Sequence, residues 1–441
     1  MIKLSDHFDS RRLIRFTAPT IGMLVFMSIY GVVDGFFVSN FVGKVAFAAI
    51  NFVMPTLMLL GFIGFLFGTG GGALIAKTIG EGNRTKANKI FSMLIYLSIF
   101  LGIIFATVGI IYVGDLAKFL GATGEFLNYS ITYGKIVLLA LPLTILQFEF
   151  QCLASTAEKP KLGFYVTVAT GLTNIFLDAL FIIIFEWGLE GAAVATALSE
   201  SVGGILPLIY FSRENSSLLR LTKTNFDIKA LIQTCTNGIS ELLSSISMSI
   251  VAMLYNWQLL NYAGSDGVAA FGILMYVTFI FEAVFIGYSV GASPIISYHY
   301  GAKNYSELKN LLKLSLMITA TFSLAMFICV ESFASPAAGI FVESDTNLLE
   351  MTVHAFRIYA FAFLFGGFAI FTSSFFTALN NCLISALISG LRTLVFEIVA
   401  VLIFPLIWGI DGIWFSMVGA DIMALIVSAV MLIVNRRRYN Y

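Results

Sequence analysis

Long apolar runs follow one another along the whole chain, and they constrain the fold more than any other feature. A helix needs about 20 apolar residues to cross a bilayer, and twelve runs of that length or more recur between short polar segments. With 59% hydrophobic and only 11% charged residues, the composition excludes a soluble globular protein. We therefore predict an all-α polytopic membrane protein. The runs lie near Leu13–Ser39, Ala46–Ala76, Lys89–Val113, Tyr129–Ala157, Leu162–Phe185, Gly191–Phe211, Ala230–Asn261, Val268–Tyr298, Leu308–Phe333, Leu348–Leu379, Ile384–Trp408 and Ile413–Val434.

The basic residues between the runs predict the orientation. Of the 25 Lys and Arg residues, 20 lie at the two ends of the chain or in every second connecting segment, whereas the other segments carry mainly acids. Because positively charged loops remain cytoplasmic, we expect both termini in the cytoplasm, which requires an even number of spans. The expected location is the cell (inner or plasma) membrane, with the first span rather than a cleaved signal peptide as the targeting signal.

One sequence unit occurs twice. The segment Gly70–Asn83 is echoed by Gly291–Asn304 at an offset of 221 residues, and the same offset pairs Trp187–Gly191 with Trp408–Gly412. A single offset that holds over such a distance indicates a duplicated six-span unit.

The duplication predicts the domain organisation. We expect an N-terminal lobe at 1–212, a cytoplasmic linker at 213–227 and a C-terminal lobe at 228–441. Since each repeat has an even number of spans, the lobes share one orientation and are related by a pseudo-two-fold axis along the membrane normal. Two such lobes around a central cleft suggest a transporter that works by alternating access.

Four polar residues inside the N-terminal apolar runs are candidates for a site: Asp34, Asn174, Asp178 and Thr196. Asn174 and Asp178 stand four residues apart, so they share one helix face. A carboxylate at mid-membrane depth costs roughly 2.5 to 3.5 kcal/mol and normally lines a bundle interior or a water-filled cavity. At the 221 offset the C-terminal lobe has apolar residues or tyrosine instead, which favours a specialised site over an inherited structural network.

The pair of acids suggests a coupling site. Two neighbouring carboxylates at low dielectric do not both stay ionised cheaply, so we expect Asp34 and Asp178 to take up a proton or recruit a cation. With the oxygens of Asn174 and Thr196 they would make a shell suited to sodium. The residues do not decide between H⁺ and Na⁺, and the alternative interpretation is that they only hydrogen-bond neighbouring helices.

The C-terminal lobe has acids of its own. Glu241 and Glu282 each lie inside a span, where they would bind a cationic substrate or act as a second coupling site. Met27 and Phe279 are candidates for an adaptable apolar lining of the cleft. Glu200 and Asp421 share the 221 offset and are expected as scaffold residues, with Arg392 as a counter-charge.

Several stretches together resemble one family. Tyr30–Val38, the repeated Gly70–Asn83 segment, Asn174–Asp178 and Gly191–Thr196 are similar to the multidrug and toxic compound extrusion (MATE) family, and Pro294–Lys303 resembles its bacterial multidrug branch. The resemblance covers nearly the whole chain and implies two six-helix lobes and cation-coupled export of organic, often cationic and lipophilic compounds. It also implies a coupling site on Asp34, Asn174, Asp178 and Thr196, and in some members an acid that Glu241 matches. One departure is the pair Asn380 and Asn381, where the family leads us to expect a Gly-Lys pair.

Two alternatives compete with an exporter. A flippase for lipid-linked sugars of the same superfamily would need a strongly cationic cavity, whereas the basic residues inside the spans are few, chiefly Lys135, Arg357 and Arg392. An enzyme is disfavoured because intramembrane protease motifs such as HExxH and GxSG are absent from the sequence. We expect small-molecule substrates and lipid as partners, a functional monomer, no nucleic acid, and no cofactor apart from the coupling ion.

Overall fold

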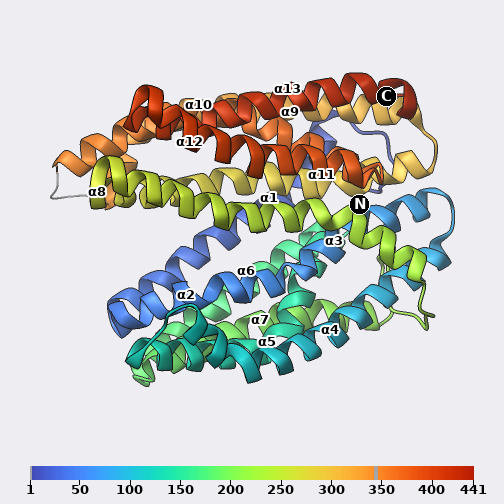
Figure 1. Ribbon diagram of the computed structural model, residues 1–441. Coiled ribbons are helices and arrows are strands. Elements are labelled where there is room, and N and C mark those ends of the chain that lie inside the picture. Colours follow the sequence, from blue (N-terminus) through green and yellow to red (C-terminus); the bar gives the residue numbers. More distant parts are fainter. Residues whose placement is uncertain (1, 342–345) are drawn as a thin grey trace.

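The computed structural model describes residues 2–341 and 346–441, and these ranges are helical almost throughout (Figure 1). Among the described residues, 12 helical spans are long and apolar enough to cross a membrane, which confirms the predicted twelve-span all-α architecture. The helices, with η marking π-helical segments, are α1 (Ser10–Phe37), η1 (Val38–Val42), α2 (Lys44–Gly61), α3 (Ile63–Gly80), α4 (Arg84–Phe119), α5 (Gly124–Thr156), α6 (Pro160–Asp178), η2 (Ala179–Ile184), α7 (Gly188–Ser212), α8 (Ile228–Gly301), α9 (Tyr305–Phe341), α10 (Thr346–Ala378), α11 (Cys382–Gly390), η3 (Leu391–Phe396), α12 (Glu397–Trp408) and α13 (Ile410–Tyr439).

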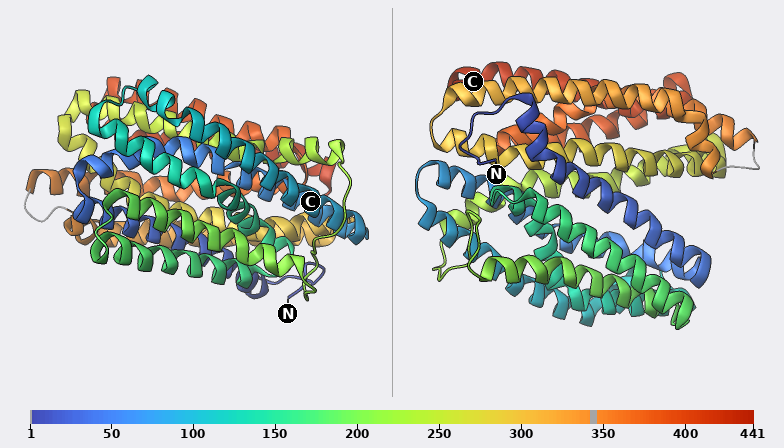
Figure 2. Two further views of the ribbon diagram at one scale, coloured as in Figure 1. Left: turned by 90° about the horizontal axis from the view of Figure 1, so that it is seen from below. Right: turned by 180° about the vertical axis from the view of Figure 1, so that it is seen from behind.

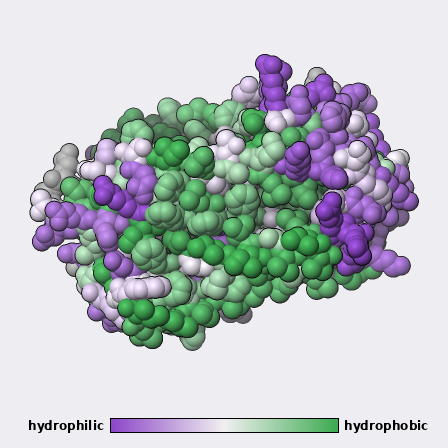
Figure 3. All heavy atoms as spheres, turned by 90° about the horizontal axis from the view of Figure 1, so that it is seen from above, coloured by the Kyte–Doolittle hydropathy of each residue, from purple (hydrophilic) through white to green (hydrophobic). Residues whose placement is uncertain are grey.

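The helices α2 to α7 and α8 to α13 form two bundles, which lie one above the other in Figure 1, and α1 runs from the upper bundle into the lower one. The two chain termini lie at the same end of the molecule (Figure 2). We call this end, which also carries Arg436, Arg437 and Arg438 at the close of α13, the basic end. The surface view in Figure 3 shows a broad hydrophobic band between two hydrophilic ends, as expected for a protein that spans a bilayer.

Single glycines turn the chain at the opposite end. The helix α8 contains two spans, Ile228–Gly264 and Asp266–Gly301, and its only non-helical backbone is at Gly264 (φ 63°, ψ −149°). Gly43, its counterpart at the 221 offset, has φ 118° between η1 and α2. Residues with a Cβ rarely adopt such angles, so the repeat has kept a glycine at both positions.

The two lobes touch backbone to backbone at the basic end. A Cβ atom placed on Gly301 of α8 would lie 2.9 Å from the carbonyl carbon of Lys77 in α3, and one placed on Gly80 of α3 would lie 3.0 Å from the carbonyl carbon of Tyr298 in α8. Lys77 and Tyr298 are themselves related by the 221 offset, as are Gly80 and Gly301. The two contacts are therefore copies of each other across the pseudo-two-fold axis, and they close the lobes together at this end.

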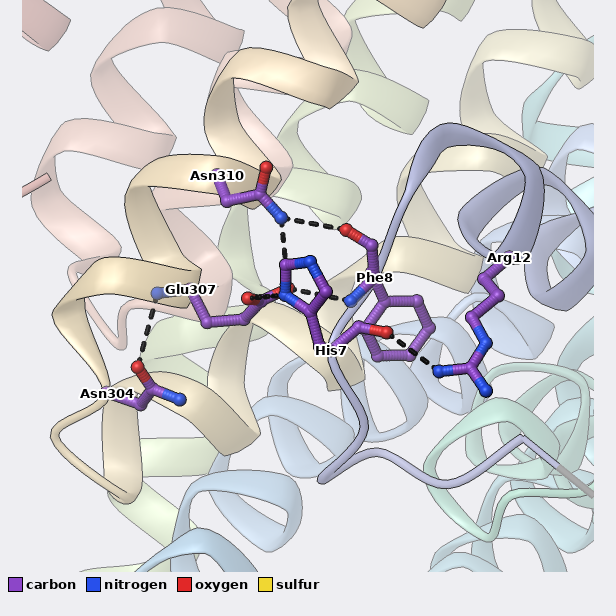
Figure 4. A network of polar contacts seen from close by, with 6 residues as sticks. All are labelled: His7, Phe8, Arg12, Asn304, Glu307 and Asn310. Atoms are coloured by element: carbon purple, nitrogen blue, oxygen red, sulfur yellow. Dashed lines mark hydrogen bonds and ion pairs between the residues drawn. The ribbon is translucent and has the colours of Figure 1, made fainter.

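The segment before α1 joins the two lobes at the same end, and Figure 4 shows its contact with α9. On the C-lobe side, Glu307 of α9 accepts the Phe8 amide at 2.9 Å and lies 2.6 Å from His7 Nδ1. On the N-lobe side, the Leu4 amide donates to Glu158, between α5 and α6, at 2.6 Å. The side chains of Leu4 and Phe8 are fully buried. We call residues 2–9 the N-terminal strap. In this closed state the strap contacts both lobes.

The segment 213–227 between the lobes packs along α4. The backbone amide of Arg220 donates to Asn88 Oδ1 at 2.9 Å, and that of Thr222 donates to Ser92 Oγ at 2.8 Å. Leu219 is fully buried. The segment is therefore attached over its middle to α4 of the N-terminal lobe.

Candidate functional site

Three helices bring the four predicted N-lobe residues into one region. Asp34 comes from the last turns of α1, Asn174 and Asp178 from the end of α6, and Thr196 from the middle of α7. The Asp34 carboxyl lies beside the carboxyl of Asp178 and the amide of Asn174. The structure therefore gathers these side chains from segments that are 140 residues or more apart in α1 and α6.

A glycine allows α1 to approach α6 this closely. A Cβ atom on Gly171 would lie 2.6 Å from the ring of Phe26 and 2.8 Å from that of Tyr30. Both distances are shorter than real Cβ contacts. Gly171 stands one turn before Asn174 and two turns before Asp178 on α6, so the same close approach brings Asp34 to these two residues.

Most oxygens of this cluster have no donor. Asp178 is fully buried, and Asn174 and Thr196 are 2% and 8% exposed. Within the described part of the chain, one carboxylate oxygen of Asp34, both of Asp178, Asn174 Oδ1 and Thr196 Oγ1 are buried without a hydrogen-bond partner. Buried polar atoms nearly always have partners, whereas these acceptors from three helices have none among the described residues. Such a set of acceptors is chemically suited to a proton or a small hard cation.

Two further residues lie in this region. The Tyr133 hydroxyl of α5, which was not predicted from the sequence, is buried without a partner among the described residues and lies near Thr196 and the two acids. Glu200, expected from the sequence as a scaffold residue, lies one turn beyond Thr196 and accepts a hydrogen bond from Thr144 of α5. Tyrosine is common in apolar runs, so only the fold associates Tyr133 with the cluster.

The end of α6 widens at the cluster. Asp178 is followed directly by the π-helical segment η2, a type of turn that is rare and frequently found at functional sites. The Trp187 ring stacks on Phe181 within this segment at 4.8 Å. The wide turn is thereby held by aromatic packing next to the acid.

Glu241 lies elsewhere, in a small cavity between the lobes. The cavity has a volume of about 40 Å³, similar to that of one or two waters, and hydroxyl groups surround the carboxyl. The hydroxyl oxygens of Thr156 and Ser289 in its wall are buried without a hydrogen-bond partner among the described residues. The polar residues of the wall are Thr69, Thr156, Glu241, Ser289, Ser293, Ser374 and Thr377.

Glu282 is separate from Glu241 and is held in an ion pair. Its Oε1 lies 3.0 Å from Arg392 Nη2, and Arg392 Nε donates to Asp421 Oδ1 at 2.8 Å. The expected counter-charge role of Arg392 toward Asp421 is therefore confirmed. The two C-lobe acids predicted for one site have different surroundings.

The two apolar candidates differ in their surroundings. Met27 is partly buried, and its sulfur accepts a weak hydrogen bond from Gln151 at 3.7 Å. Phe279 of α8 is 42% exposed. Met27 packs with Met23, Ala283 and Ile286 where α1 meets α8, so it lies at the junction of the lobes.

Twelve spans in two repeated lobes, with a buried group of unpaired acceptors in one lobe, are the features of a two-lobe membrane transporter. A model of the MatE family matches residues 19–180 and 242–403, one stretch in each lobe. These matches cover more than half of the chain. The protein therefore belongs to the MatE family, the multidrug and toxic compound extrusion (MATE) transporters, which are transporters and not enzymes.

Relatives and solved structures extend this similarity over the chain. The multidrug export protein MepA of Staphylococcus haemolyticus is 28% identical over 366 residues, which are 81% of this chain and 80% of that protein. MepA of Staphylococcus aureus (strain MRSA252) is 27% identical over 434 residues, 96% of this chain and 93% of that protein. An outward-facing multidrug resistance MATE family transporter of the MOP superfamily has the same fold, with a TM-score of 0.93, 22% identity and coverage of 99% of this chain and 98% of that one.

Proposed function

We propose that this MATE transporter is a cation-coupled antiporter that exports organic, often cationic and lipophilic compounds. The observation that carries the proposal is the set of buried oxygens without donors on Asp34, Asn174, Asp178 and Thr196. The export of drugs by the MepA proteins supports the substrate class.

The N-lobe cluster would act as the coupling site. When it is empty, two carboxylates face each other at low dielectric, which is unfavourable. A proton shared by the acids, or a sodium ion bound by them with Asn174 and Thr196, removes that repulsion. Because the cluster joins α1 to α6 and α7, loading it changes how α1 packs in the lobe. Glu241, in its hydroxyl-lined cavity between the lobes, is the candidate for a second coupling or substrate site.

Alternating access would use the contact between the lobes. The backbone contacts of Gly80 and Gly301 close the basic end in this structure. Transport requires the lobes to separate there and to meet at the other end. By the distribution of Lys and Arg, the basic end and both termini are cytoplasmic, so the closed end of this state faces the cytoplasm. The monomer holds both lobes and is the proposed functional unit.

The charge distribution favours this function over lipid-linked sugar flipping. A flippase cavity for pyrophosphate would present unpaired basic groups, but Arg392 is neutralised by Glu282 and Asp421. A cluster of acids, by contrast, suits cations.

The test is transport by the purified chain in proteoliposomes, with an imposed proton gradient in one arm and a sodium gradient in the other. Ethidium serves as the fluorescent cation. We expect Asp34→Asn and Asp178→Asn to abolish gradient-driven accumulation in the arm that drives the native protein. Glu149→Gln is the matched control, because Glu149 is also fully buried in this lobe but pairs with Ser98 of α4. Undiminished gradient-driven transport by both aspartate variants would refute the coupling role.

A further inference from the structure

A second buried charge cluster lies in the C-terminal lobe, around Arg392. This arginine lies in the π-helical segment η3, and its guanidinium bridges Asp421 of α13 at 2.8 Å and Glu282 of α8 at 3.0 Å. The Asp421 carboxylate packs against Gly366 of α10, where a Cβ atom would lie 2.6 Å from Oδ2. Asp421 is therefore fixed in position, and it holds the guanidinium of Arg392 at Nε.

A third carboxyl group lies in the neighbourhood of the same guanidinium. Glu397, the first residue of α12, is 5% exposed and is close enough to Arg392, Asp421 and Glu282 for its charge to interact with theirs. Among the described residues, no hydrogen bond or ion pair to its carboxyl is formed. The hydroxyls of Tyr255 and Tyr359, which also neighbour Glu397, are buried without partners in the described structure.

The charges of this cluster do not balance. Three carboxyl groups, those of Glu282, Glu397 and Asp421, share one guanidinium, so full ionisation would leave two negative charges in the lobe interior. An uncompensated buried ion costs several kcal/mol. Arg392 already holds Glu282 and Asp421, which leaves the Glu397 carboxylate as the group without a partner. A proton on Glu397 would remove one of these two negative charges.

We propose that Glu397 is a second proton-binding site of this transporter and that its proton decides whether Glu282 can bind a cationic substrate. The inference rests on the proposed export function. With Glu397 protonated, Arg392 stays paired with Glu282 and Asp421. When the proton leaves to water, the Glu397 carboxylate competes for the guanidinium.

The partner that Arg392 gives up is the more accessible one. The Glu282 side chain is 19% exposed, against 3% for Asp421, and Asp421 is confined by Gly366. A guanidinium that turns toward Glu397 therefore frees Glu282, which can then pair with an organic cation. The cluster therefore holds either a proton on Glu397 or a substrate cation on Glu282, but not both. An antiporter needs this mutual exclusion to exchange one for the other.

Both lobes have a π-helical turn beside a buried acid, although the turns are not at equivalent positions, since the 221 offset places η2 on residues 400–405 rather than on η3. In the N-terminal lobe Asp178 directly precedes the π-helical segment η2, and in the C-terminal lobe Glu397 directly follows η3. Both segments lie in the corresponding span of the two six-span units, the fifth and the eleventh. Each lobe thus places a buried acid next to a widened helical turn, the kind of turn often found at functional sites.

The first test is infrared difference spectroscopy of the full-length protein in nanodiscs, recorded between acidic and alkaline pH. We expect a protonated-carboxyl band that is lost in Glu397→Gln, retained at a shifted position in Glu397→Asp and unchanged in Glu282→Gln. Retention of every such band in Glu397→Gln would overturn the proposal. The band does not depend on transport, so this result is separate from the outcome for Asp34 and Asp178.

The second test is ethidium binding to the same preparations by fluorescence anisotropy. Glu397→Gln fixes the neutral form, so we expect binding several-fold weaker than in the native protein at alkaline pH and no strengthening as pH rises. An affinity that rises with pH in Glu397→Gln as it does in the native protein would overturn the link between the two residues. Asp178→Asn should keep both the band and the pH dependence due to Glu397.

Discussion

The paired glycines at the basic end allow a quantitative test of how the lobes close. In Gly301→Ala the added methyl would overlap the carbonyl oxygen of Lys77 and lie 2.9 Å from its carbonyl carbon, and 3.4 Å is the lower limit of ordinary contact. The carbon alone requires the lobes to separate by about 0.5 Å at this point, and the nearer oxygen requires more. The atom in the way is backbone, which has no rotamer to change.

The clash of the added methyl raises the free energy only of the state in which the basic end is closed. Overpacking of this kind costs about 1 to 3 kcal/mol, which shifts a two-state equilibrium by roughly 5- to 150-fold. The higher helix propensity of alanine, worth about 1 kcal/mol, acts in both states and cancels. We expect Gly301→Ala and its repeat equivalent Gly80→Ala to shift the population by similar amounts toward the state that is open at the basic end.

The measurement is a spin-label distance distribution across this end. Labels at Thr85 and Ser306, which are exposed and related by the 221 offset, report on opposite lobes. The native protein should show mainly the short distance and both alanine variants a larger fraction of the long one. Gly272→Ala is the control, since its Cβ would meet nothing within 4 Å. Unchanged distributions in both variants would refute the reasoning.

Two further predictions concern other contacts of the same machinery. Glu307→Ala removes the partner of His7 and of the Phe8 amide. The same spin-label pair should then show a broader short-distance peak. An unaltered peak would mean that the N-terminal strap does not hold the lobes together. Gly171→Ala places a methyl 2.6 Å from the Phe26 ring and should displace Asp34 from Asp178; we expect ethidium transport in proteoliposomes to fall at least several-fold while the thermal midpoint stays within a few degrees, and native-like transport would contradict this.

Much of the architecture could be predicted from the sequence because the bilayer simplifies the problem. Its thickness fixes the length of an apolar run, so the twelve spans follow from hydropathy. The 221-residue offset indicated the two lobes without any contact being known. A buried acid such as Asp178 was conspicuous for the same reason, since a charge inside an apolar run is costly and therefore rare.

Which polar residues meet was decided by the tertiary structure. Glu282 and Glu241 both lie within apolar runs, yet one pairs with Arg392 and the other lines a cavity between the lobes. Glu397 gave no separate signal, and its importance comes only from an arginine already held by two other acids. Hydropathy is a property of each residue alone, so it can be predicted from the sequence. Charge compensation depends on atoms a few ångströms apart, and only the packing of helices brings such atoms together.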